Sequence, residues 1–143
     1  MSMQAIIYGY RGKSHFDEDV VRVEYQEATK KLNGRTRPSG GRLTTCAPYN
    51  TSQGALPRDV IECPALLGHL SRERVGHRDQ KPLALIEKLI LASSRPDDLV
   101  LDCFAGSGTT GVACLRTGRK FILIEQNPEY YKLSKDRLLA EKE

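Results

Sequence analysis

The sequence predicts an α/β protein with a short parallel sheet, and three observations lead to this prediction. Residues 99–101 and 121–124 are apolar runs with the length of buried strands. A glycine-rich turn at residues 104–108 follows the first run, and residues 109–116, which have helical character, connect it to the second. Parallel strands need such a crossover, so the pattern favours a parallel pair.

Three zones are expected along the chain. Residues 1–25 contain short strand-like pieces, at residues 6–8 and at residues 20–25, where apolar and polar positions alternate. Residues 26–78 are rich in Gly, Pro, Ser, Thr and Arg and have little periodicity, which is typical of a binding loop or a linker. Residues 79–143 are the most regular part of the sequence.

This regular part should begin with a helix. Asp79 is its expected N-cap, with Pro82 in the first turn and with Pro96 and Asp97 beyond its end. One apolar stripe lies along it, made of Leu83, Ile86, Leu89, Ile90 and Ser93.

The elements that follow complete the unit. Gly118 should cap the end of the helix after the glycine turn, and Asn127 and Pro128 should begin the last helix. The two strands are apolar throughout, which predicts that both of their faces are covered. With a right-handed crossover, strand, turn, helix, strand and helix make half of a Rossmann-like fold, preceded by one extra helix.

Composition narrows the class of protein. The chain has 143 residues, 39% of them hydrophobic and 28% charged, which is typical of one globular domain. No apolar run approaches the roughly 18 residues of a membrane span, and no secretory signal is recognisable. Its four cysteines form no C-x-x-C pair, so no metal site is expected. Cys103 and Cys114 lie in apolar segments and should be buried. A cytoplasmic, reducing compartment is expected.

Basic residues are concentrated in residues 28–58, which contain six Lys and Arg and no Asp or Glu, although the whole chain carries only +4. Such a local excess favours a polyanion and predicts DNA as a partner. A solvated, flexible basic loop is the alternative. The candidate DNA-binding residues are Lys30, Lys31, Arg35, Arg37 and Arg42.

The glycine turn has the spacing of a nucleotide-binding site. Gly106-x-Gly108-x-x-Gly111 lies between a strand and a helix, as that motif requires. Glu125 ends the next strand, 19 residues after Gly106, where a carboxylate can bind ribose hydroxyls. The pattern fits either a dinucleotide or S-adenosylmethionine; a tight turn that merely needs glycine is the third reading.

Asp102 helps to decide between these ligands, because it lies immediately before the turn. A dinucleotide places its pyrophosphate at the helix N-terminus that follows, where a carboxylate would repel it. S-adenosylmethionine carries a sulfonium and an ammonium, which a carboxylate attracts. Asp102 could instead simply cap the amides of the turn, which is compatible with the same ligand.

The motifs around this turn resemble those of the DNA amino-methyltransferases, which methylate adenine N6 or cytosine N4. Asp102-Cys-Phe-Ala-Gly-Ser-Gly-Thr-Thr-Gly111 is similar to the family's D-P-F-x-G-S-G-T-T. His77-Arg-Asp-Gln-Lys-Pro82 resembles its H-P-T-Q-K-P, and Phe121-Ile-Leu-Ile-Glu125-Gln-Asn-Pro-Glu-Tyr130 resembles F-I-G-I-E-x-x-P-E-Y. The order and spacing also agree. Arg78, Asp79 and Cys103 depart from the family's usual Pro, Thr and Pro.

The resemblance implies S-adenosylmethionine as cofactor and assigns roles to the matching residues. Phe104, Gly106, Gly108 and Thr109 would surround the methionine part. Glu125 would bind the ribose, and His77 and Lys81 would lie near the methionine carboxylate, with Asp102 beside the positive groups.

The family's catalytic D/N/S-P-P-Y/F/W loop has no counterpart, because no two prolines in the sequence are adjacent. In a permuted form of the family the catalytic half comes first. Residues 1–25 would then be a strand remnant of that half, residues 26–78 a segment like the target-recognition region, and residues 79–143 the cofactor-binding unit. Apolar edges left open by missing strands would favour pairing with another chain.

The sequence therefore predicts the S-adenosylmethionine-binding part of a site-specific DNA methyltransferase, with its catalytic residues in a second chain or in a lost N-terminal half. Self-association is another expected form of partnership. A non-catalytic remnant from a phage or mobile element, which binds cofactor or DNA, is the alternative. A nicotinamide-dependent dehydrogenase is disfavoured by Asp102 and by the segment 77–82.

Overall fold

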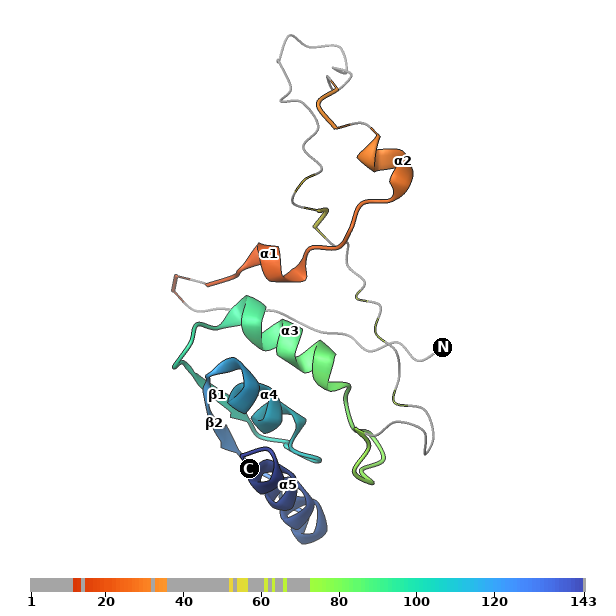
Figure 1. Ribbon diagram of the computed structural model, residues 1–143. Helices are drawn as coiled ribbons and strands as arrows, with labels where there is room; N and C mark the ends of the chain where they lie inside the picture. Colours follow the sequence, from red (N-terminus) through yellow and green to blue (C-terminus); the bar gives the residue numbers. More distant parts are fainter. Residues whose placement is uncertain are drawn as a thin grey trace.

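The computed structural model contains five helices and two strands among the residues that it describes (Figure 1). The described residues are 12–13, 15–31, 33–35, 52, 54–56, 61, 63, 66 and 73–142. The elements are α1 (Glu18–Val21), α2 (Glu27–Lys30), α3 (Leu83–Ser93), β1 (Leu99–Asp102), α4 (Thr109–Thr117), β2 (Lys120–Leu123) and α5 (Pro128–Ala140). The strand expected at residues 6–8 lies outside the described residues.

The α/β class and the parallel pairing are confirmed. β1 and β2 run parallel, with Val100 opposite Phe121 and Leu101 opposite Ile122, and α4 provides the crossover between them. Helix α3 packs on α4, and α5 follows β2 and also contacts α4 (Figure 1). The result is a β–α–β unit with helices on one side of a two-stranded sheet.

The hydrophobic core lies between α3, α4 and the sheet. Its buried residues come from the two helices, and residues from both strands and from α5 pack against them. Val112 and Cys114 are its largest fully buried side chains. The buried cluster consists of Leu83, Ile90, Val112, Ala113 and Cys114.

The caps expected for the last two helices are confirmed. Gly118 ends α4 with a left-handed φ of 70°. The side chain of Asn127 accepts a hydrogen bond from the amide of Glu129 at 2.8 Å, and Pro128 is the first residue of α5. Both signals are local, since a cap is formed by residues within one turn of the helix end.

The strand expected at residues 20–25 is wrong, because residues 18–21 form helix α1 instead. Asp17 caps this helix, and Arg22 forms ion pairs with Glu18 and Asp19, four and three residues before it. That spacing brings side chains together on a helix but not on a strand. Within residues 20–25, all of which the structure describes, only Val23 forms a β-bridge, an antiparallel one to Ala55.

The expected start of α3 is also wrong. Asp79 does not cap the helix, and Pro82 precedes the first turn rather than lying in it. The residue before a proline avoids the helical backbone conformation, so the helix cannot extend back through Lys81 to Asp79. The amide of Leu83 is instead capped by the carboxylate of Glu73 at 2.7 Å.

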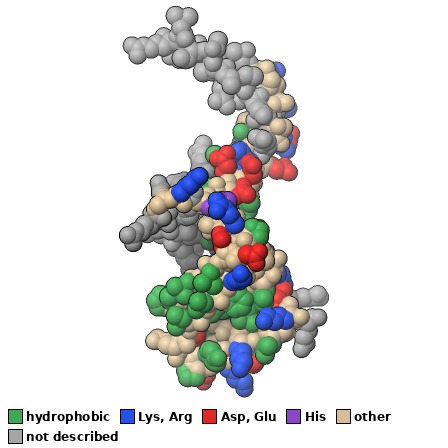
Figure 2. Space-filling view, turned by 90° about the vertical axis from the view of Figure 1, so that its left-hand side faces the viewer, with side chains coloured by type: hydrophobic (Ala, Val, Ile, Leu, Met, Phe, Trp, Pro, Cys, Tyr) green, Lys and Arg blue, Asp and Glu red, His purple; other side chains and the backbone are tan. Residues whose placement is uncertain are grey.

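Among the described residues, elements cover only one face of the sheet, contrary to the expectation of two covered faces, and hydrophobic side chains are exposed on the lower part of the molecule (Figure 2). Val100 and Phe121 face the core, whereas the alternate residues are exposed. We call the uncovered surface the open sheet face; it consists of Leu99, Leu101, Ile122 and Ile124. Cys103 beside it is exposed, so its predicted burial is wrong, whereas Cys114 is buried as expected.

Candidate functional site

Two glycines shape the turn between β1 and α4. Gly106 and Gly108 have φ values of +50° and +73°, and a residue that has a Cβ adopts such values only with strain. A Cβ on Gly108 would lie 2.9 Å from the Cβ of Ser134 in α5, and a Cβ on Gly106 would lie 3.0 Å from His77 Nε2. The turn therefore requires glycine at both positions, and it lies directly against α5 and the segment before α3.

Asp102 holds both ends of this turn. Its Oδ1 accepts a hydrogen bond from the amide of Phe104 at 2.9 Å, and its Oδ2 accepts one from Thr110 Oγ1 at 2.6 Å. In this geometry the carboxylate caps the turn, which is one of the two roles expected for Asp102. Each carboxylate oxygen still has a second lone pair, so the negative charge at the mouth of the turn remains available to a cationic ligand.

Glu125 binds the turn from the end of β2. Its two oxygens accept hydrogen bonds from the amides of Asn127 at 2.9 Å and Gly106 at 2.8 Å. These backbone hydrogen bonds, that of Asn127 first, lower the pKa of the Glu125 carboxyl below its ordinary value. The side chain is thus kept ionised and fixed in orientation beside the glycine turn.

His77 and Lys81 face the turn from the segment before α3. The ring of His77 packs against that of Tyr130 in α5, with 4.2 Å between centroids. His77 Nδ1 accepts a hydrogen bond from the amide of Asp79 at 3.1 Å, so in this arrangement the ring proton is on Nε2, which points toward Gly106. Lys81 Nζ donates to the carbonyl oxygen of Asp79 at 3.1 Å.

The glycine turn, Asp102 and the segment with His77 and Lys81 surround a cavity of about 220 Å³. The sequence-predicted residues that line it are His77, Lys81, Asp102, Phe104, Gly106 and Thr109. Two other predicted residues, Gly108 and Glu125, do not line this cavity. Gly108 packs on Ser134. Glu125 lines a neighbouring cavity of about 310 Å³, and Ala105 lines both cavities. Phe104 is 91% exposed, at the rim.

Several residues around the cavity were missed by sequence reasoning. Asp79, Ile86, Ala105, Ser107 and Thr110 also line it. Thr110 had a signal, since its helical position places its hydroxyl over the aspartate before the turn. Glu73, Tyr130 and Arg137 support the cavity from outside. Tyr130 belongs to the motif at residues 121–130, whereas nothing in the local sequence pattern of Glu73 or Arg137 identifies their long-range contacts.

The donor set fits a ligand with charges of both signs. The carboxylates of Asp79 and Asp102 and the amino group of Lys81 lie around one small cavity, next to an exposed aromatic ring. S-adenosylmethionine has a sulfonium, an ammonium and a carboxylate, and these would find opposite charges here. In the described part of the chain, no group of His, Cys, Asp and Glu could hold a metal ion.

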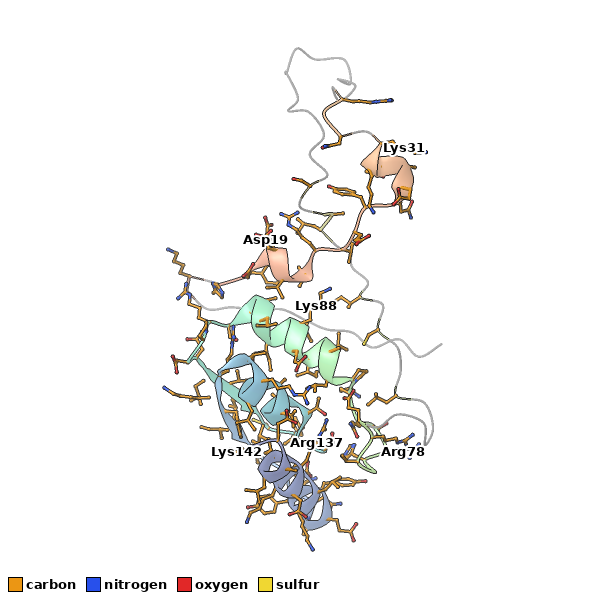
Figure 3. All side chains as sticks on the ribbon, viewed as in Figure 1. Asp19, Lys31, Arg78, Lys88, Arg137 and Lys142 are labelled. Atoms are coloured by element: carbon orange, nitrogen blue, oxygen red, sulfur yellow. The ribbon has the colours of Figure 1, made fainter. Side chains whose placement is uncertain are left out.

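The candidate DNA-binding residues lie partly in and after α2, at the opposite end of the molecule from α5 (Figures 1 and 3). Lys30 Nζ lies 2.9 Å from Glu27 and 3.2 Å from Glu24, so nearby carboxylates offset its charge. Lys31 and Arg35 are exposed, and Figure 3 shows Lys31 far from Arg137. Arg37 and Arg42 lie outside the described residues.

Comparison with known proteins gives a family match over residues 3–136, to the family described as DNA methylase. The DNA adenine methyltransferase YhdJ of Escherichia coli (strain K12) is 40% identical over 125 residues, which are 86% of this chain and 39% of that protein. The type II methyltransferase M1.MboII of Moraxella bovis is 53% identical, over 89% of this chain and 50% of that protein.

The crystal structure of the M1.HpyAVI–SAM complex is 44% identical, with a TM-score of 0.48, and covers 55% of this chain and 36% of that chain. The chain thus spans half or less of the length of these relatives. None of the helices in the described segments has the length and apolar character needed to cross a membrane. Because the family match spans nearly the whole sequence, the chain belongs to the DNA methylase family of the adenine-N6 or cytosine-N4 type, whose methyl donor is S-adenosylmethionine.

Proposed function

We propose that this chain binds S-adenosylmethionine in the cavity between the glycine turn and the segment before α3, as the cofactor-binding part of a site-specific DNA methyltransferase. The observation that carries the proposal is the carboxylate of Asp102 at the mouth of a glycine turn, opposite Lys81 and His77 across one cavity. A pyrophosphate would meet Asp102 at the helix N-terminus, whereas a sulfonium or an ammonium is attracted to it.

The residues divide the recognition of the cofactor between them. Lys81 and the Nε2–H of His77 suit a carboxylate. Asp102 suits the positive groups. Glu125 lines the neighbouring cavity, and its free lone pairs suit the hydroxyls of a ribose that extends from the first cavity into the second. Bound S-adenosylmethionine supplies a methyl group on a positively charged sulfur. The exposed ring of Phe104 lies at the rim, where it would help to keep water from that sulfur.

Methyl transfer would occur by attack of the exocyclic amino nitrogen of adenine or cytosine on that methyl group. The bond from the methyl carbon to sulfur would break, S-adenosylhomocysteine would leave, and the amino group would lose one proton. The loop that accepts hydrogen bonds from the amino group and stacks on the flipped base is absent from these 143 residues. We therefore place it outside them, either in a second polypeptide or in sequence continuous with this chain. The open sheet face supports this, because parallel sheets are normally covered on both faces.

DNA is the proposed substrate, and the basic residues 28–58 are proposed to face it. Lys31 and Arg35 are exposed, which supports phosphate contacts, whereas Lys30 is already engaged by Glu24 and Glu27. The absence of C-x-x-C pairs and the free thiols of Cys103 and Cys114 agree with a cytoplasmic location, which is part of the same proposal.

Calorimetric titration of the purified chain tests cofactor binding. S-adenosylmethionine and S-adenosylhomocysteine should bind, and NAD should give no heat of binding. Binding of NAD with no binding of S-adenosylmethionine would overturn the proposal. Nucleosides from DNA incubated with the chain and the cofactor should contain neither N6-methyladenine nor N4-methylcytosine; their appearance would contradict the placement of the catalytic loop outside the chain.

A non-catalytic module that binds cofactor or DNA is the second candidate, and the absence of adjacent prolines favours it equally. Mixing the chain with a polypeptide that carries a P-P-Y/F loop separates the two candidates. Methylated nucleosides from the mixture, but from neither component alone, support the split enzyme. Tight cofactor binding without methylation in any mixture supports the module.

A further inference from the structure

Arg137 connects the last helix to the glycine turn. Its Nη1 donates to the carbonyl oxygen of Ser107 at 3.2 Å and to Thr109 Oγ1 at 3.0 Å. Only 11% of its side chain is exposed. Figure 3 shows Arg137 where α5 meets α4. The same hydroxyl of Thr109 also lies 3.0 Å from Ser107 Oγ and 3.4 Å from the carbonyl oxygen of Lys81.

The guanidinium also reaches the segment before α3, because Arg137 Nη2 lies 3.8 Å from Glu73 Oε1. Glu73 holds that segment together: its carboxylate caps Leu83, and its carbonyl oxygen accepts a hydrogen bond from Gln80 Nε2 at 2.7 Å. The loop closed in this way, residues 73–83, contains His77 and Lys81. Arg137 therefore contacts both walls of the cavity, although it does not line the cavity.

Burying this side chain is costly, which argues for a specific use. Burial lowers the pKa of Arg137, while the charge of Glu73 acts in the opposite direction. An apolar side chain of similar length would pack in the same space without the desolvation cost. Arg116, in contrast, forms ion pairs with Glu141 and Glu87 while its side chain is half-exposed, so no buried charge has to be stabilised there.

We infer that Arg137 is a positioning residue for the cofactor, fixing the glycine turn relative to the segment that carries His77 and Lys81. This inference rests on the proposed function, in which S-adenosylmethionine binds between these two walls. Without the guanidinium, the carbonyl of Ser107 and the hydroxyl of Thr109 lose their charged donor, and the walls are free to move apart. The affinity for the cofactor then falls, although no direct contact to it is removed.

The test uses Arg137→Met and Arg137→Lys, with Arg116→Met as the matched control, which removes the half-exposed ion pairs of Arg116 in α4 with Glu141, the C-cap of α5, and with Glu87. Arg137→Met should weaken the binding of S-adenosylhomocysteine about 10- to 100-fold, the range expected for a lost hydrogen bond to a charged group. Arg137→Lys keeps the positive charge but loses the planar guanidinium with its several hydrogen-bond donors, and this variant should bind the cofactor with an intermediate affinity. Arg116→Met should bind like the unchanged chain.

Amide hydrogen exchange of the ligand-free chains gives a second readout. Arg137→Met should speed exchange in residues 106–112 and 77–83, and Arg116→Met should not. A double-mutant cycle with Thr109→Val should show non-additive losses of affinity, since Arg137 acts through that hydroxyl.

The outcomes separate this inference from the function on which it rests. If folded Arg137→Met and Arg137→Lys bind like the unchanged chain, with unchanged exchange, the inference is overturned. If the unchanged chain binds no cofactor, the proposed function fails, and the exchange comparison alone decides whether Arg137 holds the two walls. If Arg137→Met does not fold, the same two measurements on Arg137→Lys decide.

Discussion

The carboxylate of Glu125 accepts a hydrogen bond from the amide of Gly106 at 2.8 Å, across 19 residues of sequence. Its other oxygen accepts one from Asn127, the cap of α5, at 2.9 Å. A single side chain thus joins the end of β2 to the glycine turn after β1 and to the start of the last helix. Its geometry is set before any ligand arrives, which is the condition for binding a ribose without a large ordering cost.

Replacing Glu125 with Gln should make the chain less stable at neutral pH and less sensitive to acid. The folded chain lowers the pKa of Glu125, so this residue contributes stability above its unfolded value of about 4.3. That contribution is lost as the pH falls through the lowered pKa of the folded state. The free energies of unfolding of the two proteins should therefore converge in acid. A constant difference from neutral pH down to about pH 3 would contradict this assignment.

The close approach of α5 to the glycine turn predicts unequal effects for two glycine substitutions. Gly118→Ala meets no atom within 4 Å and should cost only the left-handed backbone energy, about 1–2 kcal/mol. Gly108→Ala incurs the same backbone cost and also places its Cβ 2.9 Å from Ser134 Cβ, an overlap that typically adds about 1–3 kcal/mol.

Urea unfolding of both variants checks this prediction. Gly118→Ala is the matched control, because the φ values of the two glycines differ by only a few degrees, at 70° and 73°. Equal losses would mean that α5 moves away easily and that the contact with Ser134 is not tight. Cofactor titration of Gly108→Ala should in addition show weaker binding, since the turn moves with its helix.

The second half of the fold was predictable because its signals are local. A proline after Asn127, a glycine after Thr117 and apolar runs of strand length each act within one turn or one strand. The pattern at residues 20–25 failed because its alternation was outweighed by the ion pairs of Arg22 and by burial of Val21 against α3. An alternation of apolar and polar residues over only six positions is too short to predict a strand when such contacts favour a helix.

For the site, the motifs identified six of the residues that line the cavity, but not the long-range contacts of Glu73 and Arg137 that hold its walls together. Asp102 and Gly106 belong to one short sequence, so their proximity follows from the turn. Glu73 and Arg137 are 64 positions apart and meet only after α3 and α5 have packed around the turn. Contacts of this kind depend on the tertiary fold, and no spacing rule in a single sequence specifies them.

The charge of Asp102 should matter more to the cofactor than its hydrogen bonds do. Asp102→Asn keeps the shape and loses the charge, and should weaken S-adenosylmethionine binding by about 10-fold or more, as expected for lost charge-assisted contacts. Thr110→Val keeps the charge and removes only the 2.6 Å hydrogen bond, so its loss should be smaller. If the two variants were ranked in the opposite order by calorimetry, Asp102 would be a cap of the turn and no more.

The open sheet face should determine how this chain associates. Leu101 is 60% exposed in the middle of β1, where its register partner Ile122 is also exposed. A two-stranded sheet with such a face is marginal on its own, so burial of this face should drive association with a second polypeptide or with another copy of this chain. Leu101→Lys should therefore weaken association about 10-fold or more, because it places a charge in an apolar contact.

Leu139→Lys in α5 is the control, since Leu139 is similarly exposed, at 54%, but lies away from the open sheet face. Sedimentation velocity of both variants, alone and with a polypeptide that carries the catalytic loop, measures the effect. Both should keep their circular dichroism spectrum, because neither side chain belongs to the core. If Leu139→Lys, and not Leu101→Lys, prevents association, the contact is made by the last helix and the sheet is covered in some other way.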